Sequence, residues 1–306
     1  MSRLLKLPTG RAICYSGYRE GQSPDSRVYP GPQQILEDLL ILQPHWRVLR
    51  LYDCSAHAER VLDVIRRHGL EFQVLLGAYL GAETSNAGCP WGATFTEAQL
   101  AAGIAENEVE VGRLIALANA NEDIVFAVAV GNEATVDWTD HLVPVHRMIE
   151  HVRRVRQGVR QPVTFCENYV PWRHKLRELV PELDFLSLHT YPVWEYKRIE
   201  EAMDYTRENY LSVAGLYPEK PVVITEAGWC TRSNGRDMHA AQATQEMQAL
   251  YLRELVRWTD GSGILCFVFE AFDEPWKGSA APLEPEKHWG LYTVARQPKL
   301  VMAGWT

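Results

Sequence analysis

The feature that most constrains the fold is an apolar run at residues 124–133, which reads I-V-F-A-V-A-V-G-N-E. A run of this length that ends abruptly in polar residues is typical of a strand buried on both faces. Gly131 lets the backbone turn, so Asn132 and Glu133 are expected at the carboxyl end of this strand. The same arrangement recurs in V-V-I-T-E at residues 222–226, which is followed by A-G-W. The sequence therefore predicts two buried strands that each deliver a glutamate, Glu133 and Glu226, to one cleft. Such a carboxylate pair is what glycosidic bond cleavage requires.

Strand-like and helix-like segments alternate along the rest of the chain. Strands are expected at residues 11–15, 47–52, 70–76, 124–133, 163–166, 184–189, 222–226 and 264–269. Helices are expected at residues 32–42, 56–68, 96–120, 143–158, 171–180, 199–214 and 237–259, with Leu40 and Leu250 on their buried faces. This alternation predicts a (β/α)8 TIM barrel, with residues 1–306 forming a single catalytic domain. The alternative is a doubly wound sheet with an extra domain, but the chain has no G-x-G-x-x-G turn and no break in composition.

The composition narrows the class of protein. Of 306 residues, 46% are hydrophobic and 23% charged, which predicts a sizeable core and little disorder. A net charge of −8 argues against nucleic acid as a partner and fits an enzyme acting on a neutral or cationic ligand. No apolar segment reaches the length of a membrane span or of a signal peptide, so a cytoplasmic location is expected. The six cysteines form no C-x-x-C pair and are expected to be buried, reduced thiols.

Active sites of such barrels lie at the carboxyl ends of the strands. The chain is expected to place carboxylates, amides and aromatic rings there, and these residues are Tyr15, Tyr52, Asp53, Asn132, Glu133, Glu167, Asn168, Tyr169, His189, Tyr191, Glu226, Trp229, Glu270, Glu274 and Trp276. The first strand shows no H-x-H, and the ten histidines are dispersed. We therefore expect no metal and no cofactor, which disfavours a metal-dependent hydrolase on the same barrel.

Several of these segments resemble a known family. G-N-E after strand four and T-E-A-G-W after strand seven resemble the catalytic segments of the large clan of (β/α)8 retaining glycosidases. More narrowly, the chain resembles glycoside hydrolase family 17, which acts on β-1,3-linked glucans. The resemblance extends over nearly the full length, through I-C-Y at 13–15, R-L-Y-D at 50–53, V-G-N-E at 130–133, Y-P at 191–192, I-T-E-A-G-W at 224–229, F-D-E-P-W-K at 272–277 and E-K-H-W-G-L-Y at 286–292.

The resemblance implies a role for each of the central residues. Glu133 is expected to be the general acid/base and Glu226 the nucleophile of a retaining, double-displacement mechanism. Asn132 is expected to hydrogen-bond the 2-hydroxyl of the sugar. Tyr191 is the candidate donor that keeps Glu226 ionised, although it is equally well interpreted as a packed residue before Pro192.

Further residues are expected to contact the substrate, a β-1,3-glucan or oligosaccharide. They are Tyr15, Tyr52, Asp53, Asn132, Tyr191, Trp229, Glu274, Trp276, Lys277 and Glu286. Lys277 is expected to hold Glu226 or Glu274 anionic, the alternative being a surface salt bridge of little energetic weight. Trp229 and Trp276, with Trp289, are candidate sugar platforms, and core packing is the competing interpretation for each tryptophan.

Two other functions stay open at this point. The same site is compatible with β-1,3-glucanosyl transfer, in which another sugar replaces water as acceptor. A glucan-binding barrel without catalysis is a further alternative, but both glutamates stand in intact motifs, which argues against it. The sequence does not indicate exo or endo action, or the oligomeric state.

Overall fold

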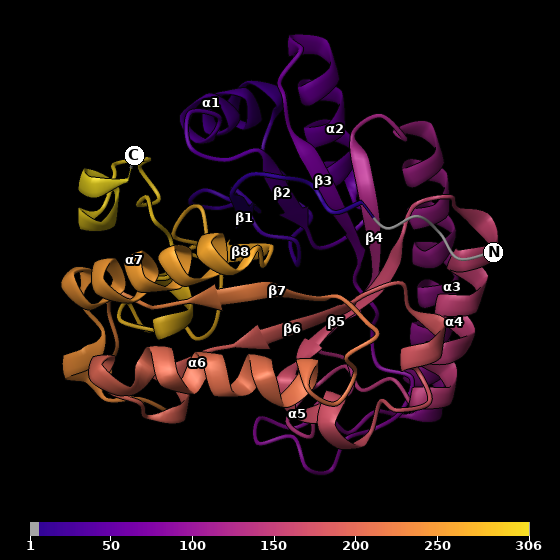
Figure 1. The fold of residues 1–306 in the computed structure, drawn as a ribbon. Helices are drawn as coiled ribbons and strands as arrows, with labels where there is room; N and C mark the ends of the chain where they lie inside the picture. The colour runs from indigo at the N-terminus through magenta and orange to yellow at the C-terminus, as the bar shows by residue number, and fades with distance from the viewer. Residues whose placement is uncertain (1–5, 306) are drawn as a thin grey trace.

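The described part of the chain folds into a closed barrel of eight parallel strands, arranged in chain order with β1 paired to β8 (Figure 1). The computed structural model describes residues 6–305. The strands are β1 (Ala12–Cys14), β2 (Val48–Leu51), β3 (Gln73–Ala78), β4 (Val125–Asn132), β5 (Val163–Asn168), β6 (Leu186–Thr190), β7 (Val222–Gly228) and β8 (Cys266–Phe269). The predicted (β/α)8 architecture is confirmed.

Helices follow most strands and surround the barrel (Figure 1). They are α1 (Pro32–Leu42), α2 (Ala56–His68), α3 (Glu97–Ala120), α4 (Val145–Gly158), α5 (Tyr169–His174), α6 (Ile199–Ala214) and α7 (Gln245–Ser262). Short 3-10 helices are η1 (Val180–Glu182), η2 (Pro192–Glu195), η3 (Ala240–Gln242), η4 (Pro285–Lys287) and η5 (Leu300–Gly304), the last of which packs on α7.

Local capping signals explain why several predicted helix ends are accurate. The Ser55 side chain accepts a hydrogen bond at the start of α2, and Gly69 ends that helix in a left-handed conformation. Thr96 and Gln99 form a capping box at the start of α3. These signals depend on residues close in sequence, so the boundaries could be predicted without tertiary information.

Two helix predictions need correction. The helix expected at 237–259 begins only at Gln245, because Thr244 caps it, and the preceding residues form the 3-10 turn η3. The helix expected at 171–180 is the shorter α5, whose start is capped by the Asn168 side chain. Leu40 and Leu250, expected on buried faces, are 46% and 45% exposed.

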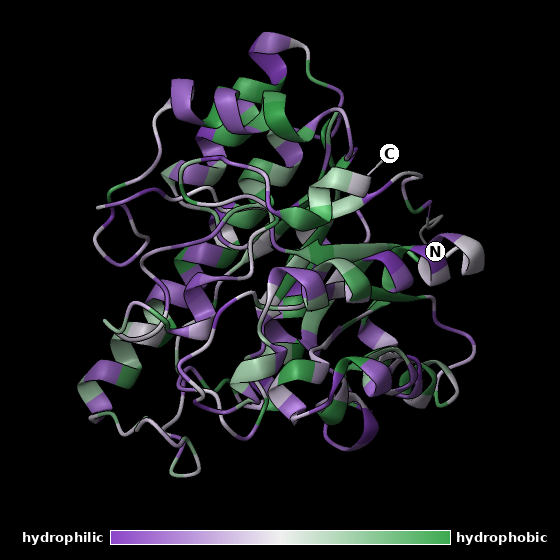
Figure 2. Cartoon of the chain, turned by 90° about the vertical axis from the view of Figure 1, so that its left-hand side faces the viewer, coloured by the Kyte–Doolittle hydropathy of each residue, from purple (hydrophilic) through white to green (hydrophobic). Residues whose placement is uncertain are grey.

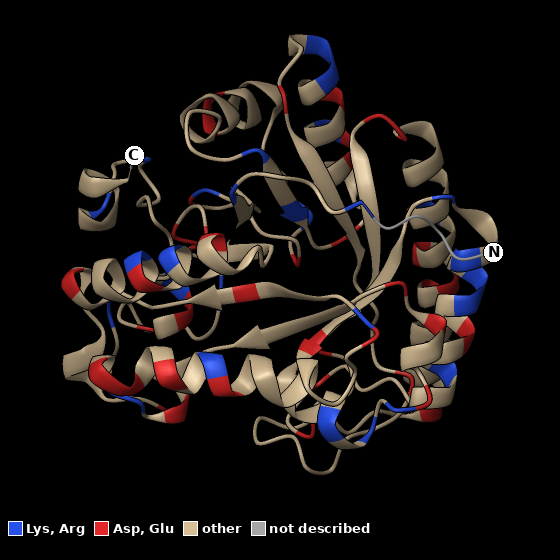
Figure 3. Ribbon diagram, in the orientation of Figure 1, with Lys and Arg blue, Asp and Glu red and all other residues tan. Residues whose placement is uncertain are grey.

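The apolar residues lie mainly in the strands and on the helix faces that pack against them, as the hydropathy colouring indicates (Figure 2). Both β2 and β7 are buried along their entire length. Charged residues are found mainly on helices and loops (Figure 3). A charged side chain within a buried strand is therefore an exception that requires a partner.

The six cysteines, all within the described residues, are free, and five of them are buried, as expected. Among the described helices, none combines the length and apolarity that crossing a membrane demands.

Pairing between neighbouring strands becomes irregular toward the carboxyl ends. Register shifts occur between Ala129 and Asn132 in β4, between Leu188 and His189 in β6, and between Ile224 and Ala227 in β7. Such irregularities re-aim side chains that would otherwise follow strict alternation. They coincide here with the polar residues that the sequence predicted at the strand ends.

Candidate active site

The two predicted glutamates meet at the carboxyl-terminal end of the barrel. Glu226 lies within β7, and Glu133 directly follows β4. An oxygen of each carboxylate and a ring nitrogen of His189, from β6, all lie within 4.8 Å of one another. Residues separated by more than ninety positions in sequence therefore converge on one small group of atoms.

Glu226 is 5% exposed and is held by three donors. Its Oε1 accepts hydrogen bonds from Arg50 Nη1 at 2.6 Å and from the Tyr52 hydroxyl at 2.9 Å. Its Oε2 accepts one from the Tyr191 hydroxyl at 2.5 Å. Burial alone would raise the pKa of Glu226, but the positive charges of His189 and Arg50 and the tyrosine hydrogen bonds outweigh it and lower the pKa. The Glu226 side chain is therefore an ionised carboxylate near neutral pH.

His189 connects the two glutamates and is fully buried. Its Nδ1 is 2.9 Å from Glu133 Oε1 and 3.3 Å from Glu226 Oε2, while Arg50 Nη1 is 3.1 Å from its Nε2. Burial lowers the pKa of His189, but the charge of Glu226 and hydrogen bonds to Cys166 and Glu133 outweigh it and raise the pKa to about 9. Because a carboxylate only accepts, the Nδ1 proton points toward Glu133.

Arg50, which lies in β2, contacts several residues of the site. Besides Glu226, its guanidinium donates to the Thr225 carbonyl at 3.0 Å and to Asn132 Oδ1 at 2.5 Å. A guanidinium has no acceptor atom, so the amide oxygen of Asn132 must face it. The Asn132 amide nitrogen is consequently directed away from the guanidinium.

Glu133 is more accessible than Glu226, with its side chain 27% exposed. Its backbone adopts a left-handed conformation with φ of 44°, two residues after Gly131 with φ of 89°. The Glu133 amide donates to the Cys166 carbonyl of β5 at 2.9 Å. This turn aims the Glu133 side chain across the barrel mouth toward β6 and β7.

A second charged group lies after β8. Lys277 Nζ is 2.7 Å from Glu270 Oε2 and 2.7 Å from Glu274 Oε2, and both glutamates are almost fully buried. Lys277 was expected to pair with Glu226 or Glu274, and the structure shows the pair with Glu274. Among the described ion pairs, none joins Lys277 to Glu226. Burial, together with the charges of Glu133 and Glu226, raises the pKa of Glu286 to about 7, against the opposing effect of Lys277.

Two residues expected at the substrate lie in the core instead. Tyr15 is 1% exposed, and its hydroxyl donates to Asp38 at 3.1 Å. Trp229 is completely buried, and its indole nitrogen donates to the Gln242 carbonyl at 2.7 Å. Neither side chain offers a face to a sugar, because each follows a strand end but points into the layer between strands and helices.

Trp276, Asp53 and Trp289 differ in exposure and in the groups that they contact. Trp276 is partly exposed and packs edge-on against Tyr18, and its indole nitrogen has no hydrogen-bond partner among residues 6–305. Asp53 accepts two hydrogen bonds from Ser55 at the start of α2 and does not contact Glu226 in the described structure. Trp289, the other candidate platform, is fully buried behind Tyr191.

Sequence reasoning assigned no role to Arg50 and left His189 as one of many strand-end residues. A signal for Arg50 was present, because a charged residue between two leucines in a buried strand must find a counter-charge. The convergence of Glu133, His189 and Glu226 also resembles a cation site. However, the Arg50 guanidinium already contacts both His189 and Glu226, so a positive charge is supplied from within the chain.

Known proteins resemble this chain in sequence and in structure. A family model described as the BtgE/BtgC glycoside hydrolase domain matches residues 12–290. A protein of Arthroderma benhamiae named glucan 1,3-beta-glucosidase is 26% identical over 279 residues, covering 86% of this chain and 82% of that protein.

Two solved structures share the fold. An endo-laminarinase from a Formosa strain is 29% identical with a TM-score of 0.82, covering 96% of this chain and 85% of that one. A glycoside hydrolase family 17 beta-1,3-glucanosyltransferase from Rhizomucor miehei is 24% identical with a TM-score of 0.71, covering 95% of this chain and 96% of that one. At 24% identity, the similarity to the Rhizomucor miehei structure concerns the fold alone.

Proposed function

Because the chain belongs to the BtgE/BtgC glycoside hydrolase domain family, we propose that it hydrolyses β-1,3-glucosidic bonds in β-1,3-glucans or laminari-oligosaccharides. The observation that carries this proposal is the approach of Glu133 and Glu226 to within 4.8 Å at the mouth of the barrel. The proposed specificity for β-1,3 linkages is supported by relatives named glucan 1,3-beta-glucosidase and endo-laminarinase. We further propose membership of glycoside hydrolase family 17, on the V-G-N-E and I-T-E-A-G-W segments that carry the two glutamates.

Glu226 is the proposed nucleophile. A nucleophilic carboxylate must be ionised, and the pKa of Glu226 is lowered by His189 and Arg50 despite burial. Glu133 is the proposed acid/base. It is more exposed than Glu226, so it can exchange protons with the leaving group and with water.

The reaction proceeds by two displacements. In the first, a Glu226 oxygen attacks the anomeric carbon while Glu133 gives its proton to the departing glycosidic oxygen, and a glycosyl ester with Glu226 forms. In the second, Glu133 takes a proton from water, the water oxygen attacks the same carbon, and the ester bond breaks to restore the Glu226 carboxylate. The short separation of the carboxylates favours this course, because an inverting enzyme needs about 6.5–9.5 Å to accommodate a water.

Asn132 is proposed to bind the 2-hydroxyl of the sugar at the reacting position. Its amide oxygen is held by Arg50, which leaves the amide nitrogen to donate. A hydrogen bond to this hydroxyl strengthens as positive charge develops at the anomeric centre, so it stabilises the transition state more than the ground state.

A time course on laminari-oligosaccharides, followed by NMR for the anomer and by chromatography for product length, tests the proposal. The expected first product is the β-anomer, released with shortening of the chain. Initial release of the α-anomer would contradict the double displacement. Products longer than the substrate would show transfer to sugar rather than to water.

Variants of the two glutamates test their roles. Glu226→Ala is expected to lose nearly all turnover on every substrate. Glu133→Ala is expected to lose turnover on oligosaccharides but to keep activity on a substrate with an activated leaving group, with azide accelerating the second step. Unchanged turnover of Glu226→Ala would indicate a different nucleophile, whereas a wild-type chain that binds glucan without turning it over would be a binding protein.

A further inference from the structure

The turn that presents Glu133 has an unusual backbone that must be held in place. Glu133 has a φ of 44° although it carries a side chain, and L-residues rarely adopt this left-handed conformation because it brings the Cβ too close to the following carbonyl oxygen. Left-handed residues persist where surrounding contacts over-determine them. The contacts around this turn therefore decide where the carboxylate of the proposed acid/base points.

His141, from the loop after β4, binds the peptide group that joins Asn132 to Glu133. Its Nε2 is 2.9 Å from the Asn132 carbonyl oxygen. Because a carbonyl only accepts, this ring nitrogen must carry the proton. The ring is 17% exposed, so the hydrogen bond is largely shielded from water.

Three further groups fix the orientation of the His141 ring. Its Nδ1 is 2.7 Å from Asp140 Oδ1, 3.1 Å from the Thr139 hydroxyl and 3.1 Å from the Tyr79 hydroxyl. The Tyr79 ring, which directly follows β3, also packs on the imidazole with ring centroids 4.8 Å apart. These contacts come from two different loops, so the Nε2 proton is aimed at Asn132 before any substrate binds.

The other side of the turn is fixed independently by β5. The fully buried carboxylate of Glu167 accepts hydrogen bonds from the Thr135 amide at 2.9 Å and from its hydroxyl at 2.6 Å. The Glu133 amide is bound by the Cys166 carbonyl. His141 therefore provides the contact on the Asn132 side of a turn whose opposite side is already anchored.

We propose that His141 is a positioning residue that sets the direction of Glu133 through its hydrogen bond to the Asn132 carbonyl. This inference rests on the proposed function, because it takes Glu133 as the acid/base. Glu133 and His141 are not in hydrogen-bond contact in the described structure, so His141 acts through the peptide between Asn132 and Glu133. Its loss would rotate that peptide and move the carboxyl proton away from the glycosidic oxygen.

Dependence on the leaving group distinguishes this role from a general contribution to folding. A sugar hydroxyl is a poor leaving group and needs protonation, whereas 2,4-dinitrophenolate leaves without it. A misplaced Glu133 therefore slows cleavage of laminaripentaose but not the first step on 2,4-dinitrophenyl β-laminaribioside. A merely structural defect would slow both substrates together.

Two substitutions at position 141 separate the outcomes. In His141→Gln the amide nitrogen can reach about as far as Nε2, so it should restore the bond to Asn132. In His141→Asn the shorter amide can replace only Nδ1. We expect His141→Asn to lower kcat/KM for laminaripentaose by about 10–100-fold, with the change mainly in kcat, and to stay within about threefold on the dinitrophenyl substrate. His141→Gln should remain within about threefold on both.

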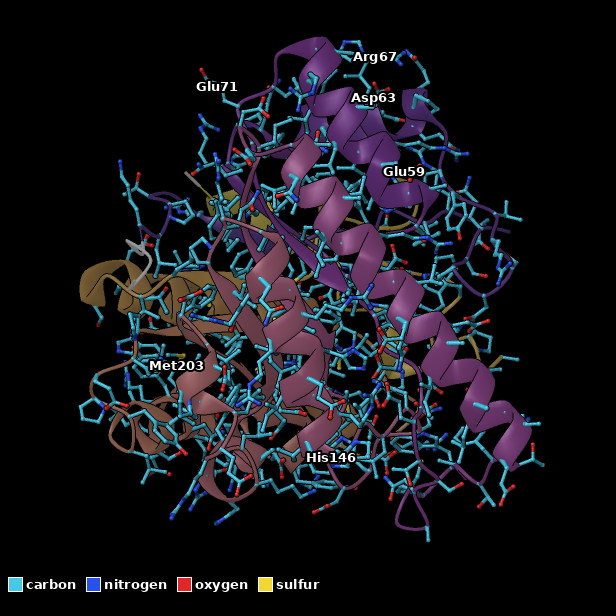
Figure 4. All side chains as sticks on the ribbon, turned by 90° about the vertical axis from the view of Figure 1, so that its right-hand side faces the viewer. Glu59, Asp63, Arg67, Glu71, His146 and Met203 are labelled. Carbon is cyan, nitrogen blue, oxygen red and sulfur yellow. The ribbon has the colours of Figure 1, made fainter. Side chains whose placement is uncertain are left out.

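His146→Asn is the matched control, because His146 is exposed at the start of α4 on the outer surface (Figure 4). The His146→Asn variant should leave kcat/KM unchanged on both substrates. Equal losses on both substrates in His141→Asn, or no loss on either, would overturn the positioning role. Glu133→Ala in the same assay tests the proposed function separately. If it shows no preference for the activated substrate and no azide rescue, the acid/base assignment fails, whatever the His141 variants do.

Discussion

At the scale of single residues, the position of Arg50 explains why a carboxylate can remain charged inside a barrel. Its guanidinium is 2% exposed and donates to Glu226, Asn132 and the Thr225 carbonyl. A buried charge is tolerated when its hydrogen-bonding capacity is satisfied by partners of this kind. Arg50 thus sets the charge of the proposed nucleophile and the orientation of the Asn132 amide at once.

Arg50→Gln is expected to shift the acidic limb of the pH–rate profile upward. Arg50 lowers the pKa of Glu226, so its removal raises that pKa, and Glu226 becomes protonated at a higher pH. An opposite charge at this distance typically lowers a carboxyl pKa by 1–3 units, so the limb in kcat/KM should move by about one unit or more.

Arg50→Lys provides the contrast, because it keeps the charge but cannot bridge two acceptors as a guanidinium does. It should leave the acidic limb nearly in place while lowering kcat. Arg67→Gln, on the exposed outer surface of α2 (Figure 4), is the neutral control. An unmoved acidic limb in Arg50→Gln would contradict the electrostatic role.

Aromatic residues show the limit of reasoning from residue type. Trp229 and Trp276 both follow strand ends, yet one is completely buried and the other is partly exposed. A tryptophan suits a core and a sugar platform for the same reason, its large apolar face. Only the direction of each side chain separates the two roles.

At the scale of elements, the end of β4 depends on a glycine. Gly131 has a φ of 89°, and a Cβ placed there would lie 3.0 Å from Met148 Cε and 3.2 Å from the Phe165 ring. The strand can therefore turn toward Asn132 and Glu133 only because this position has no side chain.

Gly131→Ala is expected to lower the free energy of unfolding by about 1–3 kcal/mol, since it combines an unfavourable φ with overpacking. It should also reduce turnover, because Glu133 lies two residues away. Gly261→Ala is the matched control within α7, where a Cβ would meet nothing within 4 Å, and it should be neutral or slightly stabilising. Urea denaturation of both variants measures the difference, and equal stability of the two would refute the steric argument.

At the scale of the whole molecule, one buried carboxylate joins the loop after β3 to two outer helices. Glu83 accepts hydrogen bonds from Asn107 of α3 and from Arg147 of α4, and it pairs with the buried His151 of α4 at 2.7 Å. Burial would raise the pKa of Glu83, but these three partners lower it to about 2. The charged form of Glu83 therefore stabilises this side of the barrel.

This network predicts a pH dependence of stability with a definite sign. The folded pKa of Glu83 lies below the ordinary value of 4.5, so its contribution is complete above about pH 4.5 and is lost as the pH falls toward 2. The stability gap between the wild-type chain and Glu83→Gln should thus be largest near neutral pH, at a few kcal/mol, and should narrow below pH 4.5.

Denaturant melts between pH 3 and 7 measure this gap, with Glu71→Gln as a control on the exposed surface (Figure 4). The difference in stability between the wild-type chain and Glu71→Gln should be small and should not vary with pH. A gap for Glu83→Gln that widens toward acidic pH would reverse the assigned sign.

The sequence by itself determined the order of strands and helices, most helix ends, and the delivery of Glu133 and Glu226 to strand ends. These features follow from hydrophobic periodicity and capping, which act between residues only a few positions apart. Irregular stretches such as residues 237–244 were missed because a 3-10 turn and a cap interrupt an otherwise helical pattern.

Only the tertiary structure decided which side chains share the site. Closure of the barrel brings Arg50 beneath Glu226 and His189 between the two glutamates, and register shifts at the strand ends re-aim the residues that follow them. The same closure turns Tyr15 and Trp229 into the core. The physical reason is that a contact between distant residues depends on the stagger of every strand between them, and side-chain direction depends on local packing, neither of which a short stretch of sequence encodes.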